Sequence, residues 1–211
     1  MNILEWARRK LSYNSLSWKF RLVSEDLRGL DFTRDLSAVG ISNDPALSFG
    51  YSSSGNKYLS KVLKDLRIST ADKIIDIGCG KGGAMRIMLK FPFSRVDGLE
   101  ISDRLAVIAR KNFRILRIPS KRCQMITMDA SLFQDLDPYN YIYFFNPFPS
   151  SVMIKFMTNL LTSVGRMPRN VFILYNNPKC HDVIVDTGVF RKVGEYPSHS
   201  DMKLFVYSGH A

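Results

Sequence analysis

Residues 74–83 read Ile-Ile-Asp-Ile-Gly-Cys-Gly-Lys-Gly-Gly, an apolar run that leads directly into a cluster of glycines. The isoleucines are β-branched and apolar on both faces, as expected of a strand buried inside a parallel sheet. Gly78, Gly80 and Gly82 allow a sharp turn and a close approach to a ligand, because they carry no Cβ. A helix predicted over 84–90 would direct its free N–H groups at that ligand. The stretch therefore predicts a strand–turn–helix unit that binds a nucleotide-like molecule.

The glycine spacing alone fits two kinds of loop, since both G-x-G-x-G and G-x-G-x-x-G can be placed on it. In dinucleotide-binding enzymes an acid lies about 20 residues further on, at the end of the second strand. Here Glu100 ends an apolar run that begins at Arg95, and its carboxylate can accept hydrogen bonds from both hydroxyls of a ribose. Asp76 lies inside the first strand, where its charge would repel a phosphate and attract an amine. Asp76 therefore favours a ligand with an amino group.

The loop from Asp76 to Gly82, the acid Glu100 and a third strand ending in Asp129-Ala130 together resemble the class I S-adenosylmethionine-dependent methyltransferases, over most of the chain. The resemblance implies an α/β, Rossmann-like seven-stranded sheet, mostly parallel with an antiparallel C-terminal strand, and helices on both faces. It also implies S-adenosyl-L-methionine as cofactor, held by the glycine loop at its methionine part, by the second-strand acid at its ribose and by the third-strand acid at its adenine. The cofactor-binding residues that it assigns are Tyr51, Asp76, Gly78, Cys79, Gly80, Gly82, Glu100, Ile101, Asp129 and Ala130.

A fourth strand, the aromatic run 139–145, ends in Asn146-Pro147-Phe148-Pro149. Ligands of open α/β sheets bind beyond the carboxyl ends of the strands, so this segment is the predicted reaction edge. It is similar to the Asn-Pro-Pro-Tyr motif of amino-methylating members of the family, in which the Asn side chain and the first proline's carbonyl orient the substrate nitrogen. That similarity implies Asn146, Pro147 and Phe148 as catalytic residues. Phe148 replaces the motif's second proline, so nitrogen is only slightly preferred over oxygen as the methyl acceptor.

Three alternatives remain open from the sequence. Asn146-Pro147 is also compatible with a simple turn that starts a helix over 150–162. A hydroxyl acceptor would require a general base, for which the candidates are His181, His199 and Asp201. A non-catalytic protein that binds the cofactor or an anion on the same fold is the second functional hypothesis, whereas a nicotinamide dehydrogenase is disfavoured by the acid in the first strand and by the short chain.

Ahead of the core, the small-residue loop 47–55 contains Tyr51, which precedes the first core helix. This arrangement and the ending Phe-Asn-Pro-Phe at 145–148 are similar to an under-described bacterial branch of the methyltransferases. The similarity implies that Tyr51 lies near the cofactor's sulfonium, since the face of an aromatic ring attracts a cation. We therefore predict a helical extension with a lid-like loop over residues 1–56 and an S-adenosylmethionine-binding domain over residues 57–211.

The composition bounds the remaining functions. The 211 residues are 45% apolar, which is enough for one domain with a full core. No stretch is long enough to cross a membrane and the first residues lack the order of a secretion signal, so the expected location is the cytoplasm. Cys79, Cys123 and Cys180 are odd in number and scattered, so neither a disulfide framework nor a metal site is predicted.

The net charge of +11 points to an anionic partner. Its main source is the segment from Arg104 to Arg122, which contains seven Lys or Arg residues and no acid. Nucleic acid is a possible substrate but is not favoured, because the sequence contains no RNA-binding module. The expected partners are therefore S-adenosylmethionine and an unidentified acceptor, for which an anion is one option. The sequence does not determine the oligomeric state.

Overall fold

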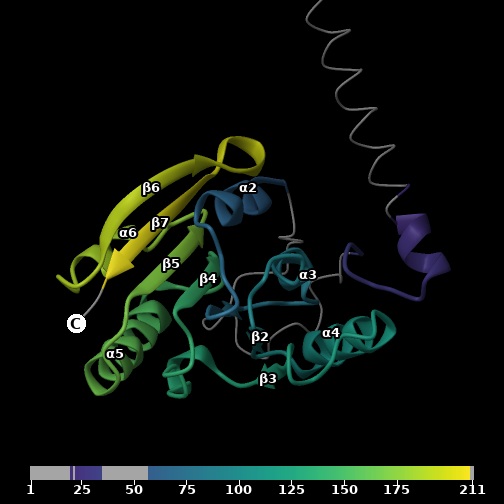
Figure 1. Cartoon of the computed structure of the whole chain (residues 1–211), viewed down its shortest axis with the longest axis horizontal. Coiled ribbons are helices and arrows are strands. Elements are labelled where there is room, and N and C mark those ends of the chain that lie inside the picture. The colour runs from purple at the N-terminus through teal and green to yellow at the C-terminus, as the bar shows by residue number, and fades with distance from the viewer. Residues whose placement is uncertain (1–19, 21, 35–56, 210–211) are drawn as a thin grey trace, which may run out of the picture.

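The computed structural model describes residues 20, 22–34 and 57–209, and within them the strands form one seven-stranded sheet in the order β3-β2-β1-β4-β5-β7-β6 (Figure 1). The strands are β1 (Lys73–Ile77), β2 (Arg95–Glu100), β3 (Met125–Thr127), β4 (Tyr141–Phe145), β5 (Val171–Asn176), β6 (Arg191–Pro197) and β7 (Lys203–Gly209). β7 runs antiparallel to both of its neighbours, β5 and β6, whereas the other pairs are parallel. The predicted fold class is confirmed.

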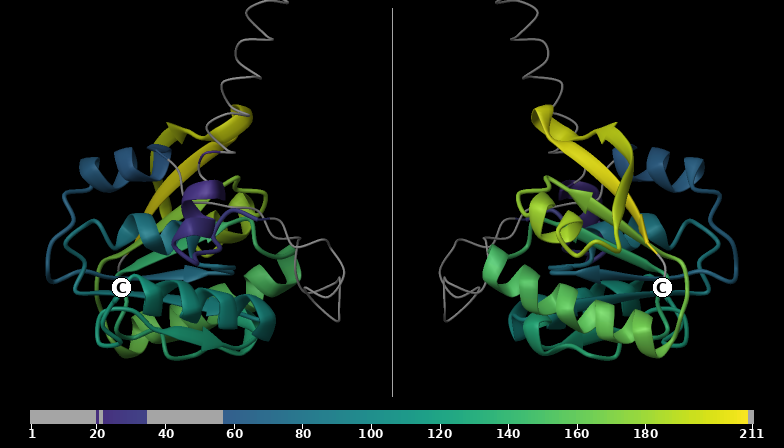
Figure 2. Two further views of the ribbon diagram at one scale, coloured as in Figure 1. Left: turned by 90° about the vertical axis from the view of Figure 1, so that its right-hand side faces the viewer. Right: turned by 90° about the vertical axis from the view of Figure 1, so that its left-hand side faces the viewer.

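Helices cover both faces of this sheet (Figure 2). They are α2 (Lys57–Asp65), α3 (Gly83–Met88), α4 (Asp103–Ile115), α5 (Ser150–Arg166) and α6 (His181–Val185), with 3-10 turns η1 (Ala130–Leu132) and η2 (His199–Asp201). Residues of α5 and α6 pack on one face, and residues of α2, α3 and α4 pack on the other. The parallel strands are therefore buried between two apolar clusters, one on each face of the sheet. The carboxyl ends of these strands lie together at one edge of the sheet.

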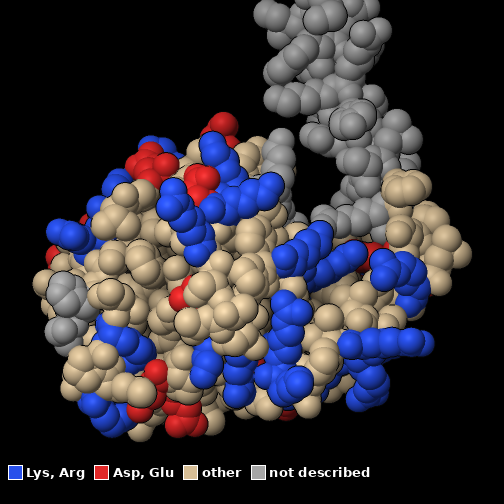
Figure 3. Space-filling view, viewed as in Figure 1, with Lys and Arg blue, Asp and Glu red and all other residues tan. Residues whose placement is uncertain are grey.

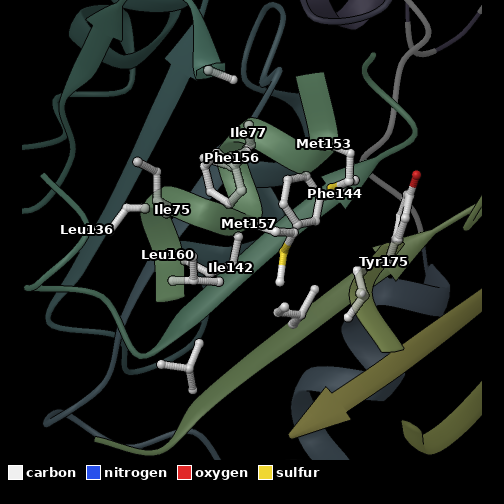
Figure 4. Close-up of a cluster of buried hydrophobic side chains, with 14 of the residues drawn as sticks. Ile75, Ile77, Leu136, Ile142, Phe144, Met153, Phe156, Met157, Leu160 and Tyr175 are labelled. Atoms are coloured by element: carbon white, nitrogen blue, oxygen red, sulfur yellow. The ribbon is translucent and has the colours of Figure 1, made fainter. Parts of the chain in front are cut away.

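The cluster on the α5 face is rich in aromatic rings (Figure 4). Phe144 of β4 lies at its centre, with ring centroids 5.3 Å from Phe156 and 5.5 Å from Tyr175. A fully buried side chain of this size stabilises the fold by about 1.5–3 kcal/mol. Burial on both faces explains why β1 and β4 have apolar residues at nearly every position.

Several predicted boundaries differ from the structure in detail. The glycine-loop helix begins at Gly83 and ends at Met88, and β5 continues to Asn176. The connection between β6 and β7 is short, because β6 continues through Pro197 to pair with β7. The lid-like loop, Tyr51 and most of the predicted extension 1–56 lie outside the described residues.

Candidate functional site

The glycine loop turns away from β1 through three left-handed residues, Gly78, Gly80 and Gly82, with φ of 75°, 54° and 84°. Residues that carry a side chain rarely adopt this backbone conformation, which explains why glycine occupies these three positions. The backbone N–H groups of Gly78 and Cys79 donate to the Leu99 carbonyl at 2.8 and 3.1 Å. The loop is thereby fixed to the end of β2, beside the predicted ribose acid, and the Cys79 side chain is buried beneath it.

Glu100 joins the end of β2 to this loop. One carboxylate oxygen accepts the Gly80 N–H at 2.8 Å and the other accepts the Ser102 N–H at 2.9 Å. Burial raises the pKa of Glu100, while the hydrogen bonds from Ser102 and Gly80 lower it. Each carboxylate oxygen has a further lone pair, so the group can hold the loop and still accept bonds from a diol. Ile101 follows directly and is half-buried.

Asp76 is 1% exposed, and its Oδ2 has no hydrogen-bond partner among the described residues. Burial raises the pKa of Asp76 well above its usual value, and the nearby Glu100 charge raises it further. A buried carboxyl in this state lacks the cation or donor that would favour its charged form. The absence fits the expected role of Asp76, which is to meet the amino group of a ligand.

Asn146 directly follows β4 and has a φ of 41°, a left-handed conformation that Asn adopts more readily than most residues with a side chain. Its Oδ1 accepts a hydrogen bond from the Tyr175 hydroxyl at 3.3 Å, and that hydroxyl accepts the Cys180 N–H at 3.3 Å. Figure 4 shows the Tyr175 ring at the border of the aromatic cluster, with its oxygen directed away from it. The orientation of the Asn146 amide is therefore fixed by the neighbouring strand.

The structure brings the glycine loop and the reaction edge together. A Cβ atom on Gly78 would collide with the ring of Pro147, so the two turns are in direct contact. Phe148, in contrast, is 4% exposed and packs edge-on against Phe144 inside the core. It supports the edge from below and does not cover it. Asn146 and Pro147 follow directly on the carboxyl end of β4, whereas the Phe148 ring lies in the core.

The third predicted contact region follows β3. Asp129 lies two residues beyond the end of this short strand, and its side chain accepts the Ser131 N–H at 2.8 Å, which starts the turn η1. Ala130 is buried. Asp129 has a second carboxylate oxygen that can accept a bond from a ligand amine. Glu100 and Asp129 follow neighbouring strands, so a ligand can lie across both.

Sequence reasoning missed the polar residues that attach the N-terminal segment to the glycine loop. Lys81 is fully buried, and its Nζ donates to Asp31 and to the Arg34 carbonyl at 2.7 Å each. Asn112 of α4, also fully buried, accepts the Asp31 N–H at 2.8 Å and donates to the Lys81 carbonyl at 3.2 Å. The available signal for this attachment was the position of Lys81 between glycines of the ligand loop. Its partner Asp31 could not be identified from the sequence, because it lies 50 residues earlier.

The candidate bases and the basic segment are also placed. His181 begins α6, and its Nδ1 lies 2.7 Å from the Tyr207 hydroxyl. Figure 3 shows Lys and Arg side chains gathered around α4. Arg110 and Arg122 donate to backbone carbonyls, so they are part of the fold, and the cations that are exposed on this segment include Arg104, Lys111, Arg114, Arg117 and Lys121.

Two features are absent from the described part of the chain. No group of three or more His, Cys, Asp or Glu side chains is placed there to hold a metal ion. None of its helices is long and apolar enough to cross a membrane.

Known proteins share this architecture. A S-adenosylmethionine-dependent methyltransferase from Aquifex aeolicus superposes with a TM-score of 0.58 at 12% identity, over 71% of this chain and 88% of that one. An RNA methyltransferase from Salinibacter ruber, solved with S-adenosyl-L-homocysteine, superposes with a TM-score of 0.55 at 14% identity, over 74% and 92%. The chain has a methyltransferase fold.

Sequence comparison gives shorter matches. Two curated relatives are described as ribosomal protein L11 methyltransferases: one from Ruminiclostridium cellulolyticum is 25% identical over 85 residues, and one from Nitrosomonas europaea is 31% identical over 80 residues. These matches cover 40% and 38% of this chain, and the chain spans only about a quarter of the relatives' length, 27% and 26%. No protein-family model matches the chain.

Proposed function

We propose that the protein transfers a methyl group from S-adenosylmethionine to an acceptor bound beside Asn146. The observation that carries the proposal is the direct contact between the glycine loop and the reaction edge, at Gly78 and Pro147. A methyl donor in the loop and an acceptor at the edge would then be neighbours, and methyl transfer chiefly requires that the two be held in line and shielded from water.

The residues present fit the cofactor. The glycine loop presents no Cβ atoms to the methionine part at Gly78, Gly80 and Gly82, and the unpartnered Oδ2 of Asp76 lacks the donor that an amino group would supply. Glu100 would hold the ribose, while Ile101, Asp129 and Ala130 would surround the adenine, as the family resemblance implies. When bound, the cofactor supplies an electrophilic methyl group on a sulfonium leaving group. Tyr51 remains proposed as a contact near the sulfonium.

The acceptor would be oriented by Asn146 and by the Pro147 carbonyl. Asn146 Oδ1 already accepts one hydrogen bond from Tyr175, which leaves one lone pair on Oδ1 and the two Nδ2 donors for the acceptor. Nitrogen stays slightly preferred because an amine can donate to Oδ1 and to the carbonyl while its lone pair faces the methyl group. The exposed cations of the α4 segment would suit an acceptor that is anionic elsewhere, and nucleic acid is one such class, although it is not favoured.

The test is turnover with S-adenosylmethionine, read out as S-adenosylhomocysteine formed with a panel of amine and hydroxyl acceptors. Asn146→Gly removes the side chain and keeps the left-handed backbone, and it is expected to lower kcat at least tenfold. Asn177→Gly is the matched control, because Asn177 is also left-handed, with a φ of 54°, just beyond the end of β5. Equal turnover in wild type and Asn146→Gly would refute the role of Asn146. Cofactor binding without turnover on any acceptor would favour the non-catalytic alternative.

A further inference from the structure

Within the described residues, four buried side-chain oxygens have no hydrogen-bond partner: Asp76 Oδ2, Tyr143 Oη, Asn176 Oδ1 and Ser198 Oγ. Leaving a buried polar atom unpaired costs about 1–3 kcal/mol, so folded proteins keep few of them. Ser198 lies in the connection between β6 and β7. The other three lie on β1, β4 and β5, which are adjacent in the sheet.

These three side chains share one face of the sheet. Asp76 and Tyr143 are direct partners in the pairing of β1 with β4. Tyr143 in turn pairs with Leu174, two residues before Asn176, and side chains two residues apart on a strand point the same way. Tyr143 and Leu174 belong to the cluster under α2 and α3, so all three oxygens lie on that side.

Tyr143 lies between the other two. Burial raises the pKa of its hydroxyl most, the Asp76 charge raises it further, and the Asn176 amide lowers it. The Asn176 amide therefore lies near the Tyr143 hydroxyl, yet neither that hydroxyl nor Asn176 Oδ1 has a hydrogen-bond partner of good geometry. The three residues are 1%, 0% and 2% exposed, so they form one buried polar cluster next to the start of the glycine loop.

The chemistry of the cluster selects its occupant. All three unpartnered atoms are oxygens that can accept a hydrogen bond, and one belongs to a carboxyl group. A primary ammonium has three N–H donors and no acceptor, which matches this set in number and in kind. An anion would meet the charges of Asp76 and Glu100, whereas a cation would stabilise them.

We propose that Asp76, Tyr143 and Asn176 form a binding site for a primary ammonium group. The inference rests on the proposed function only for the source of that group. Two molecules of the proposed reaction carry one: the amino-acid end of S-adenosylmethionine, and an amine acceptor. The new assignments are Tyr143 and Asn176, whose oxygens complete the site beside the acid.

The experiment compares S-adenosylhomocysteine with its analogue lacking the α-amino group, by calorimetry on the whole chain. Wild type is expected to bind the amino form at least tenfold more tightly. Tyr143→Phe and Asn176→Leu should each reduce this ratio at least threefold and leave the affinity for the analogue unchanged. Ser198→Ala, which removes the fourth unpartnered oxygen, is the control and should leave the ratio as in wild type.

A second titration distinguishes the source. Here n-butylammonium is added to protein saturated with S-adenosylhomocysteine and followed by NMR, with butyrate as the anionic control. An acceptor site predicts a calorimetric ratio near one, together with binding of butylammonium that is lost in Tyr143→Phe and Asn176→Leu. If wild type bound no S-adenosylhomocysteine, the proposed function would fail, and butylammonium added to the free protein would still decide on the ammonium site.

The folding of the variants is itself informative. Each substitution removes a buried oxygen that lacks a partner, so the free energy of unfolding should stay the same or increase. A purely structural role for either side chain would instead destabilise the protein. Loss of stability in both variants, or an equal loss of affinity for both ligands with no butylammonium binding, would overturn the proposal.

Discussion

Tyr175 is the residue that decides how Asn146 is presented. Its hydroxyl links the Cys180 N–H to Asn146 Oδ1 at 3.3 Å on each side. Burial raises the pKa of Tyr175, so the hydroxyl keeps its proton and remains a donor. Tyr175→Phe is expected to lower kcat several-fold, because the Asn146 amide can then rotate, and to lower the free energy of unfolding by about 1 kcal/mol. Turnover and urea unfolding measure the two effects.

The matched control is Tyr207→Phe. The Tyr207 hydroxyl also makes a hydrogen bond, with Nδ1 of His181 at 2.7 Å. In the described structure it contacts neither Asn146 nor the glycine loop. This variant should lose stability to a similar extent and keep the wild-type kcat. If both variants lowered kcat equally, the effect of Tyr175 would be general destabilisation and its positioning role would be refuted.

Gly78 is a second such residue, because adding a single Cβ atom there is expected to change stability and ligand binding. Alanine there would be strained by the φ of 75° and would also collide with Pro147. Gly188 has a φ of 69° but open space around it, so Gly188→Ala meets only the backbone strain, about 1–2 kcal/mol. We expect Gly78→Ala to lower the free energy of unfolding clearly more, and to weaken S-adenosylhomocysteine binding, in urea unfolding and calorimetry. Equal stabilities of the two variants would show that the contact is loose.

At the scale of elements, the segment 25–34 is attached to the glycine loop and α4 by polar groups. Glu25 lies in a short helix over 22–27. Its carboxylate accepts hydrogen bonds from the N–H groups of Phe32 and Thr33 at 3.0 and 2.9 Å, which closes the turn after this helix. Arg86 of α3 lies over the Phe32 ring at 4.9 Å, and Lys81 binds Asp31. The segment 25–34 is therefore in direct contact with the glycine loop through Lys81 and with α3 through Arg86.

Two acids of this segment give a clean comparison. Asp31 pairs with the fully buried Lys81, whereas Asp26 pairs with Arg34 at the surface, where the side chains are 48% and 60% exposed. Asp31→Ala should lower the free energy of unfolding by about 1–3 kcal/mol, because a charged hydrogen bond to a buried lysine is lost. Asp26→Ala should lower it by about 1 kcal/mol or less. Equal effects in urea unfolding would contradict the attachment.

The elements themselves were largely predictable, and the attachment was not. β1 and β4 were predictable from the sequence because strands buried on both faces are almost entirely apolar. The glycines indicated the turn between β1 and α3. The sequence did not show that Lys81 is buried, since its partner Asp31 is distant in sequence. The burial of Phe148 was not predictable either, because it depends on the packing of its ring against Phe144 inside the core.

At the scale of the whole molecule, two acids give opposite pH dependence. The pKa of Asp76 is raised well above 3.8 in the folded protein, chiefly by burial, so its contribution to stability is full below that pH and is lost as the pH rises toward the folded pKa. Hydrogen bonds from Arg166 hold the pKa of Asp137 at about 2, so its contribution is lost as the pH falls toward that value.

Asp76→Asn removes the first effect. Between about pH 4 and pH 8 this variant is expected to lose less stability than wild type, whereas Asp137→Asn should keep the wild-type loss over the same range. Urea unfolding at the two pH values, without ligand, measures the difference. An Asp76→Asn profile parallel to that of wild type would mean that Asp76 is already ionised in the free protein.

The sheet architecture was implied by the family resemblance, and the positions of Glu100 and Asn146 followed from strand ends, which sequence patterns locate well. The cluster of Asp76, Tyr143 and Asn176 did not, because nothing in the sequence signals a function at Tyr143 or Asn176. Their significance depends on which side chains fail to find partners after three strands have paired. The sequence therefore predicts a ligand at this edge of the sheet, and the packing adds the unpartnered oxygens from which the ammonium site is proposed.

The most direct test of the account is calorimetric titration of the wild-type chain with S-adenosylhomocysteine. The account predicts saturable binding of one ligand per chain, weakened roughly 10–100-fold by Glu100→Ala, which removes a charged acceptor and the bond to Gly80. Glu195→Ala, at a surface ion pair with Lys192, should leave the affinity unchanged. Absence of binding to wild type at millimolar ligand, or tighter binding of NADH, would contradict the account.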